Sequence, residues 1–223
     1  MFGFFGINRT HLVLEDETVL DLCAPIDEVC YVVLDTELTG LDVKKDSIVS
    51  IGAVRMTGGR IHLGRTLDLM VSPETSLTSA SVLVHGITPS EVENKPSICS
   101  VLDEFRRFCE GCVVVGHFVS LDLAFLNREC KRLQERRIDQ PAVDTWRLQT
   151  WIQNQTSAAA RDFRDAGEND LFSLAKKHNI PVTNAHNALA DAFVTAQLFQ
   201  RFLSALPPLG VSTVKDLLRI GKP

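Results

Sequence analysis

Two carboxylates stand two positions apart at the end of an apolar run, in which Tyr31 to Leu34 lead into Asp35 and then Glu37. If the run is a β-strand, its side chains alternate between two faces, so both acids project from the same side. At roughly 5 Å separation and an effective dielectric constant near 20, their repulsion is on the order of 3 kcal/mol. A divalent cation would offset this repulsion, so the spacing indicates a metal site. A solvated strand end is the alternative.

A third acid stands at the start of a helix. Asp122 falls in the first turn of a helix expected from Ser120, which can act as its N-cap, to about Arg136. The apolar segment 113–116 just before it has the composition of a buried strand. An acid in this position lies near the carboxyl end of that strand, where ligands collect in α/β sheets.

A histidine and a fourth acid stand at the start of a long apolar helix expected over 188–206. In a continuous helix a five-residue offset separates side chains by about 140°, so His186 and Asp191 converge only if His186 precedes the helix. Asn187 is a suitable N-cap, which places Asp191 in the first turn and His186 on the loop. This arrangement puts a mobile base beside a fixed metal ligand, as hydrolysis requires.

The remaining elements predict how these residues are positioned. Strands over 47–56 and 61–71, joined by a tight hairpin at 57–60, make an antiparallel meander with the first strand. Helices then alternate with strands, which predicts an α/β fold with a mixed sheet and helices on both faces. We expect 1–29 to be an N-terminal extension without an assigned role, 30–206 to be one domain, and 207–223 to be a C-terminal tail. The other expected elements are helices over 79–84, after Pro96, over 147–153 and over 171–177, a strand over 141–145, and a mobile loop over 155–169.

The net charge of −5 and the pI near 5.7 exclude a broad basic surface of the kind that holds long duplex nucleic acid. They permit a short-range grip on a few nucleotides once metal neutralises the acids of the site. With 45% hydrophobic and 23% charged residues, the chain has an ordinary soluble composition.

The cysteines predict a reduced protein. The chain has six of them among apolar neighbours and is large enough to fold without disulfides, so we expect all six to be thiols. Cys109 and Cys112 lack a second ligand pair, so they indicate a helix end and a strand start rather than a zinc site. No stretch approaches about 18 apolar residues, so we expect a cytoplasmic protein without a membrane partner.

Three segments together resemble the DEDD exonuclease superfamily in its histidine variant, the group that contains the proofreading epsilon subunit of bacterial DNA polymerase III. They are Leu34-Asp35-Thr36-Glu37-Leu38-Thr39-Gly40, the segment from Val115 to Leu126, and His186-Asn187-Ala188-Leu189-Ala190-Asp191-Ala192. Val84-His85-Gly86-Ile87-Thr88 and Asp144-Thr145 also resemble family segments. The resemblance implies a ribonuclease H-like form of the mixed sheet and makes 30–206 a 3′-5′ exonuclease domain.

The resemblance also implies a reaction and a cofactor. Asp35, Glu37, Asp122 and Asp191 would hold two Mg²⁺ or Mn²⁺ ions, and His186 would act as the general base. The substrate would be the 3′ end of single-stranded or frayed nucleic acid, DNA favoured, and the product a nucleoside 5′-monophosphate. A DNA polymerase subunit is a possible partner, and oligomeric state is not indicated.

Three alternatives stay open at this point. The first is an RNA-trimming exoribonuclease of the same family, and the second is a nucleic-acid-binding module without catalysis. The third is a haloacid-dehalogenase-type phosphatase with Asp35 as its nucleophile, although the downstream lysine and acidic pair of that class do not stand out.

Substrate contacts are carried over from the family with two departures. Leu38 stands where a threonine is usual, and Phe118 replaces the asparagine that commonly follows the motif's histidine. His85 either lines the pocket for the terminal nucleotide or only ends a helix. The residues expected to contact substrate are Thr36, Leu38, Thr39, His85 and Phe118.

Overall fold

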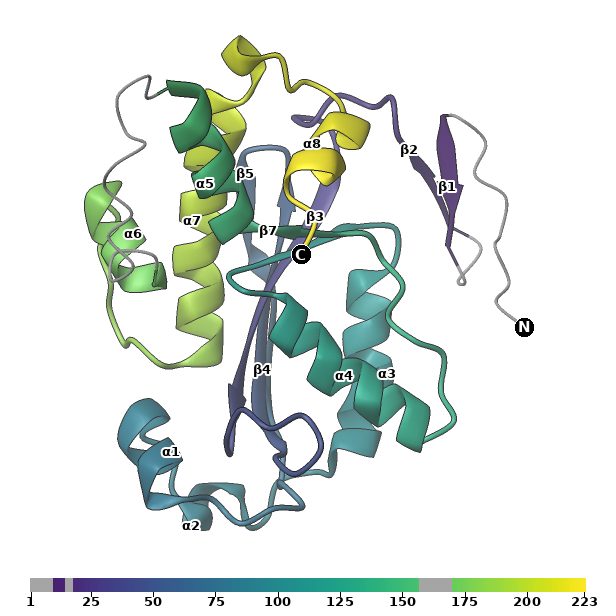
Figure 1. The fold of residues 1–223 in the computed structure, drawn as a ribbon. Helices are drawn as coiled ribbons and strands as arrows, with labels where there is room; N and C mark the ends of the chain where they lie inside the picture. Colours follow the sequence, from purple (N-terminus) through teal and green to yellow (C-terminus); the bar gives the residue numbers. More distant parts are fainter. Residues whose placement is uncertain (1–9, 15–17, 157–169) are drawn as a thin grey trace.

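A five-stranded mixed sheet forms the centre of the molecule in the computed structural model, which describes residues 10–14, 18–156 and 170–223 (Figure 1). Its strand order is β5-β4-β3-β6-β7. Within this sheet, β4 pairs antiparallel with both β3 and β5, whereas β6 and β7 run parallel to β3. The predicted meander followed by parallel strands is therefore confirmed. The strands are β3 (Cys30–Leu38), β4 (Ile48–Thr57), β5 (Arg60–Met70), β6 (Val113–Gly116) and β7 (Ala142–Asp144).

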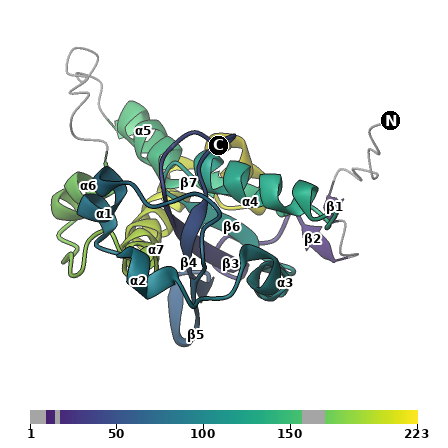
Figure 2. The ribbon, with the colours of Figure 1, turned by 90° about the horizontal axis from the view of Figure 1, so that it is seen from below.

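Helices cover both faces of the sheet. Figure 2 shows α7 on one side of strands β3 and β4 and α3 on the other. None of the described helices is long and apolar enough to cross a membrane. The helices are α1 (Ser79–His85), α2 (Pro89–Val92), α3 (Ile98–Cys109), α4 (Ser120–Arg132), α5 (Thr145–Thr156), α6 (Leu171–Lys177), α7 (Ala188–Ala205), a 3₁₀ turn (Pro207–Leu209) and α8 (Val214–Ile220), beside a hairpin of β1 (His11–Val13) and β2 (Val19–Asp21).

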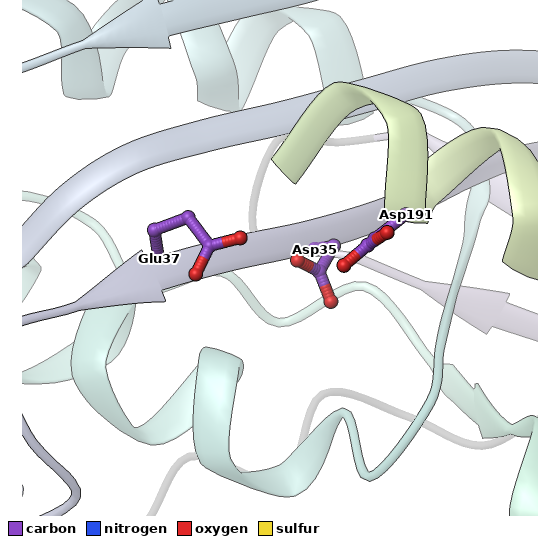
Figure 3. A group of neighbouring side chains, drawn as sticks. All are labelled: Asp35, Glu37 and Asp191. Carbon is purple, nitrogen blue, oxygen red and sulfur yellow. The ribbon is translucent and has the colours of Figure 1, made fainter. Parts of the chain in front are cut away.

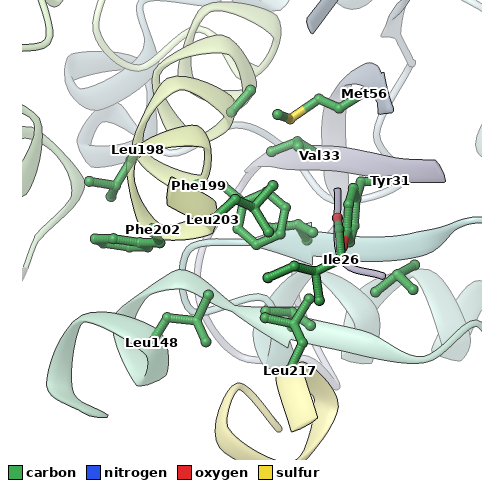
Figure 4. Close-up of a cluster of buried hydrophobic side chains, with 14 of the residues drawn as sticks. Ile26, Tyr31, Val33, Met56, Leu148, Leu198, Phe199, Phe202, Leu203 and Leu217 are labelled. Carbon is green, nitrogen blue, oxygen red and sulfur yellow. The ribbon is translucent and has the colours of Figure 1, made fainter. Parts of the chain in front are cut away.

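The alternation of side chains along β3 divides the core into two halves. Tyr31 and Val33 pack in the half covered by α7, whereas Val32 and Leu34 pack in the half covered by α3 and α4. In the first half the Tyr31 ring meets the edge of Phe199 of α7 with ring centroids 4.9 Å apart (Figure 4). Burial of large side chains, worth about 1.5–3 kcal/mol each, therefore anchors α7 against β3.

Both ends of the described chain contribute to this core. Leu20 and Ile26 pack in the half that also contains Val214 and Leu217 of α8. Ile26 donates its backbone N–H to Ser212, and Asp144 donates its backbone N–H to Gly221. Segments 18–29 and 207–223 are thus packed onto the sheet.

Helix boundaries differ from the expected ones where local capping decides them. Helix α4 ends at Arg132 rather than near Arg136, because Gln134 adopts φ of +58° and the N–H of Glu135 bonds to the carbonyl of Cys130. This is a Schellman motif, which terminates a helix. Val119, not Ser120, occupies the N-cap position, without a side-chain capping bond.

The fifth helix is longer than expected. It begins at Thr145 because the Asp144 carboxylate accepts from the N–H of Trp146, and it continues to Thr156. Most of the loop expected over 155–169 lies outside the described residues, so the structure does not test it.

The prediction that all six cysteines are reduced is wrong for two of them. Cys30 and Cys112 form a disulfide with Cα atoms 4.7 Å apart. They directly precede Tyr31 and Val113, which are partners in the parallel β3–β6 ladder, so sheet register brings them together. Their separation of 82 residues concealed this pairing in the sequence. Cys109 ends α3 as predicted, and the remaining cysteines, Cys23, Cys99, Cys109 and Cys130, are free.

Candidate active site

Three of the four predicted acids meet at the end of β3. Carboxylate oxygens of Asp35, Glu37 and Asp191 all lie within 4.8 Å of one another. Figure 3 shows Asp35 and Glu37 on the strand and Asp191 on the adjoining helix, with their carboxylates turned toward a common space. The first two share a strand face as their spacing predicted, and Asp191 comes from the first turn of α7. We call Asp35, Glu37 and Asp191 the acidic cluster.

A glycine lets α7 approach the strands closely enough to complete the acidic cluster. Gly52 of β4 lies opposite Asp35 in the antiparallel ladder. A Cβ at Gly52 would lie 2.1 Å from the carbonyl carbon of Ala188 and 2.1 Å from the nitrogen of Leu189. No side chain larger than hydrogen fits there, so the first turn of α7 rests directly on the backbone of β4 and Asp191 reaches Asp35.

Asp122 reaches the site from the opposite face of the sheet. It is buried in the first turn of α4, and its Oδ1 accepts a hydrogen bond of 2.6 Å from the Thr36 hydroxyl. Thr36 points away from Asp35 and Glu37 because neighbours on a strand alternate. Asp122 is not one of the three residues whose oxygens all lie within 4.8 Å. It does lie close enough that its charge raises the pKa of both Asp35 and Glu37.

Burial and mutual repulsion make the site electrostatically unfavourable without a cation. Loss of solvation is the largest cause of the raised pKa of Asp35, and repulsion from Asp122, Glu37 and Asp191 adds to it. Loss of solvation, followed by repulsion from Asp191 and Asp122, raises the pKa of Glu37 to about 8. Burial likewise raises the pKa of Asp122 to about 7 and that of Asp191 to about 6, the latter opposed by His186.

These residues fit a divalent cation. The Asp191 Oδ1 atom is buried and accepts no hydrogen bond within the described part of the chain. No ion pair of the described residues involves any member of the acidic cluster. A set of hard carboxylate oxygens suits Mg²⁺ or Mn²⁺, and a bound cation would satisfy the orphaned oxygen and relieve the repulsion.

His186 lies on the loop before α7, where the sequence placed it. Asn187 is the N-cap, and its side chain accepts from the N–H of Ala190 at 3.0 Å. The His186 backbone has φ of +63°, and its N–H donates to Asp191 Oδ2 at 3.0 Å. Its exposed ring meets the edge of Phe172 with ring centroids 4.9 Å apart. The backbone is thus fixed to a cluster acid while the ring faces solvent.

His85 ends helix α1 and also lies near His186. Its Nδ1 accepts from the N–H of Ile87 at 3.0 Å, which leaves the proton of the neutral ring on Nε2. That Nε2 is buried and has no hydrogen-bond partner among the described residues. Burial, followed by the charge of His186, lowers the pKa of His85. His85 therefore ends a helix, as one of the two alternatives expected, and it also presents an unused buried donor near His186.

Of the other residues expected to contact substrate, some have side chains that already bond or pack within the protein, and one has an exposed side chain. Thr39 is buried; its hydroxyl accepts from the N–H of Ser47 at 2.9 Å, and its own N–H bonds to the Ser47 carbonyl. Thr36 is committed to Asp122. Leu38 is partly buried against the core beneath α3 and α4. Phe118, by contrast, is 46% exposed.

Sequence reasoning missed two positioning features. The first is Gly52, although a glycine in the middle of a strand is a recognised sign of close backbone approach. The second is Asp144, whose buried Oδ1 accepts from the N–H groups of Phe118 and Trp146. Asp144 lies close to Phe118 because Gly116 pairs with Asp144 in the β6–β7 ladder, and the sequence does not reveal this pairing.

A mixed sheet with an acidic cluster at the carboxyl end of its central strand defines a nuclease of ribonuclease H-like architecture. A family model described as "Exonuclease" (RNase_T) matches residues 32–199. The chain therefore belongs to this family of exonucleases, enzymes that hydrolyse phosphodiester bonds.

Several relatives of this chain have names that refer to DNA polymerase III. The chain is 37% identical over 195 residues to a DNA polymerase III subunit epsilon-like protein of Rhodobacter capsulatus, which covers 87% of this chain and 26% of that protein. It is 31% identical over 176 residues to the DNA polymerase III subunit epsilon of Aquifex aeolicus, covering 79% of this chain and 81% of that protein. The chain spans only 15% of the PolC-type DNA polymerase III of Thermotoga maritima, to which it is 32% identical.

Solved structures share the fold. E. coli Exonuclease I in complex with a dT13 oligonucleotide superposes with a TM-score of 0.71 at 19% identity, over 82% of this chain and 43% of that one. Exonuclease X in complex with 5′ overhanging duplex DNA superposes with a TM-score of 0.61 at 22% identity, over 85% of this chain and 98% of that one.

Proposed function

We propose that this chain is a metal-dependent 3′-5′ exonuclease that removes nucleoside 5′-monophosphates from the 3′ ends of single-stranded or frayed nucleic acid. The observation that carries the proposal is the acidic cluster, whose carboxylate oxygens converge within 4.8 Å without any cationic side chain paired to them in the described residues. The repulsion between these buried carboxylates disfavours the folded state unless a bound cation offsets it.

Asp35, Glu37 and Asp191, with Asp122 beside them, would hold two Mg²⁺ or Mn²⁺ ions. Bound there, the ions would lower the pKa of the attacking water and stabilise charge on the phosphate and the leaving 3′-oxygen. Thr36 holds Asp122 in position through the 2.6 Å hydrogen bond. Gly52 holds Asp191 in position by letting α7 rest on β4.

His186 accepts the proton of the attacking water in this proposal. Its backbone is tied to Asp191, while its exposed ring lies against Phe172. The imidazole of free histidine titrates near neutral pH, and general-base assistance contributes roughly 10²- to 10⁴-fold.

The terminal nucleotide would contact His85 and Leu38. The Nε2–H of His85 is a buried donor without a partner in the described residues, and a hydroxyl or phosphate oxygen of the substrate would satisfy it. Leu38 offers apolar surface for a base at the end of β3. Thr36 and Thr39 would take part through backbone atoms, because their hydroxyls are already paired.

DNA is the favoured substrate and a DNA polymerase subunit the favoured partner, because the relatives are named as parts of DNA polymerase III. The net charge of −5 supports a short single-stranded end rather than a long duplex. An exoribonuclease acting on the same 3′ ends is the second candidate, which differs only in tolerance of a 2′-hydroxyl.

Matched 5′-labelled DNA and RNA 12-mers incubated with the protein and Mn²⁺ test the proposal. A ladder that shortens from the 3′ end, faster for DNA and absent with Asp35→Asn, is the expected result. Shortening from the labelled end, or internal cuts that persist in Asp35→Asn, would overturn it. Faster loss of the RNA oligomer would instead select the exoribonuclease.

A further inference from the structure

An aromatic surface built from Phe118, Trp146 and Arg147 lies just after strands β6 and β7, and we call it the aromatic ledge. The rings of Phe118 and Trp146 lie 5.5 Å apart between centroids with an interplanar angle of 35°. The guanidinium of Arg147 lies 4.9 Å from the centroid of Trp146. Phe118 is the exposed ring, at 46%, and Trp146 supports it from a partly buried position.

One buried carboxylate holds the backbones of both aromatic residues of the ledge. Asp144 Oδ1 accepts from the N–H of Trp146 at 2.9 Å and from the N–H of Phe118 at 3.3 Å. His117 Nδ1 bonds to the Thr145 hydroxyl at 2.9 Å and ties the same two loops together. The two aromatic residues are therefore fixed relative to each other although they are 28 positions apart in the chain.

The backbone of Phe118 is left-handed, with φ of +57°. Bulky residues rarely adopt this conformation, whereas asparagine adopts it more readily. The fold thus holds a large apolar ring in solvent, in a conformation that a smaller polar residue would occupy at lower cost. The Phe118 ring packs only in part, against Trp146 and against the His117 ring with centroids 4.6 Å apart, and backbone preference does not favour phenylalanine at this position.

The ledge lies at the same edge of the sheet as the acidic cluster. Strands β3, β6 and β7 run parallel, so their carboxyl ends share one edge. Phe118 follows β6, Trp146 follows β7, and Asp35 and Glu37 of the cluster lie toward the carboxyl end of β3. Asp144 beneath the ledge is close enough to Asp122 for its charge to raise the pKa of that residue. A nucleic-acid strand that entered the cluster along the carboxyl ends of β6 and β7 would pass over the ledge.

We propose that the aromatic ledge stacks an unpaired nucleobase next to the terminal nucleotide, with the base on Phe118 and Arg147 paired to a phosphate of the same strand. This inference rests on the proposed exonuclease function. Phe118 supplies a π-face that any base can use, and Arg147 supplies the charge complementary to the backbone. Because neighbouring bases cover both faces of a base inside a duplex, the ledge selects single-stranded ends.

Binding of fluorescein-labelled dT12, with phosphorothioate linkages at its 3′ end to slow hydrolysis, tests the ledge by anisotropy. Phe118→Asn should weaken binding about 10-fold, since stacking of one base on an aromatic ring contributes at that level. Phe118→Trp should restore it to within about twofold. The melting temperature of Phe118→Asn should equal or exceed that of the parent, because asparagine suits the left-handed backbone.

A scan of single abasic positions near the 3′ end identifies the stacked base. One position, the second to fourth from the end, should weaken binding by the parent about 10-fold and leave binding by Phe118→Asn unchanged. Leu63→Ala is the matched control, since Leu63 is 75% exposed on β5, and should change nothing. Arg147→Ala should reduce the slope of log affinity against log salt concentration by about 1, as expected for the loss of one phosphate contact.

Two outcomes would overturn the proposal that the ledge stacks a base. One is unaltered affinity for dT12 in Phe118→Asn. The other is an equal loss of affinity, in parent and variant, when one position of the oligonucleotide is abasic. Hydrolysis of unmodified dT12 is measured separately. A parent that binds through the ledge but releases no mononucleotide would refute the proposed function and leave the ledge standing. Release of mononucleotides at the same rate by the parent and Phe118→Asn would support the proposed function and refute the ledge.

Discussion

Gly52 of β4 and Ala188 of α7 approach so closely that a Cβ on Gly52 would lie 2.1 Å from the carbonyl carbon of Ala188. The contact is between two backbones, so no side-chain rotation can relieve it. Because Gly52 is the ladder partner of Asp35 and Ala188 begins the helix that carries Asp191, this one contact sets the distance between two acids of the cluster.

Gly52→Ala should therefore displace the first turn of α7 and separate Asp191 from Asp35. We expect a loss of about 1–3 kcal/mol in the free energy of unfolding, typical of overpacking, and a larger loss of hydrolysis. Denaturant titration and oligonucleotide hydrolysis measure the two effects. Gly64→Ala is the matched control, because a Cβ at Gly64 on β5 meets nothing within 4 Å. Full activity in Gly52→Ala would show that the helix position is not critical.

Asp35→Asn and Asp191→Asn should each lower kcat by roughly 10³-fold or more, since metal-assisted charge stabilisation is worth several kcal/mol and each 1.4 kcal/mol is tenfold. Hydrolysis of labelled dT12 in Mg²⁺ measures this loss, and circular dichroism checks that the fold is kept. Asp103→Asn, at an exposed ion pair with Arg107, should be indistinguishable from the parent. Parent-level turnover in either cluster variant would remove the proposed metal mechanism.

His186→Ala should lower kcat by roughly 10²-fold or more while metal affinity changes little, because the side chain is proposed to move a proton rather than to hold an ion. The acidic limb of the pH-rate profile should flatten in the variant. Isothermal titration with Mn²⁺ separates the roles: a large loss of metal affinity would make His186 a ligand, and an intact acidic limb would assign the proton to another group.

Stability without metal should fall as pH rises. In the unfolded chain the carboxyl of Glu37 titrates near 4.5, whereas in the folded chain burial and repulsion raise its pKa to about 8. Between these values the unfolded state has lost the proton that the folded state keeps, so alkaline pH favours unfolding. The pKa values of Asp122 and Asp191, raised to about 7 and about 6, act in the same direction.

Melting temperatures in EDTA and in Mn²⁺ between pH 5 and pH 9 measure this linkage. We expect the EDTA curve to decline through this window and Mn²⁺ to restore more stability at pH 8.5 than at pH 5.5. In EDTA, Asp35→Asn should be more stable than the parent above pH 7, because it removes one charge from the cluster. A pH-independent difference between the two curves would contradict the linkage.

Thr36→Val should destabilise the protein by about 1–3 kcal/mol, because it removes the hydroxyl donor to the buried Asp122 carboxylate. Without this hydrogen bond the pKa of Asp122 should rise, so its carboxylate should be protonated more readily and activity should fall most at low pH. Thr195→Val is the matched control. The Thr195 hydroxyl is buried without a partner among the described residues, so its removal should be neutral or stabilising. Equal effects at the two positions would deny Thr36 a role in holding Asp122.

The elements and the placement of the acidic side chains on them were predictable from local pattern. Alternation along β3 placed Asp35 and Glu37 on one face, and the Asn187 cap placed Asp191 in the first turn of α7 with His186 before it. Such inferences succeed because strand period and helix capping act over a few residues, within reach of the sequence itself. The limits of α4 and α5 were less accurate, because a Schellman motif and a carboxylate from the preceding strand decide them.

Relationships between distant elements belong to the tertiary structure. The disulfide between Cys30 and Cys112, the arrival of Asp122 from the opposite face through Thr36, and the support of Phe118 and Trp146 by Asp144 all depend on sheet register. Register is set by the packing of whole faces, and a shift of one residue would exchange every partner. The sequence by itself therefore determined which acids and which histidine the proposed site is built from. Only the packing of α7 on Gly52 and of β6 beside β3 and β7 decided how closely they meet and which aromatic surface lies beside them.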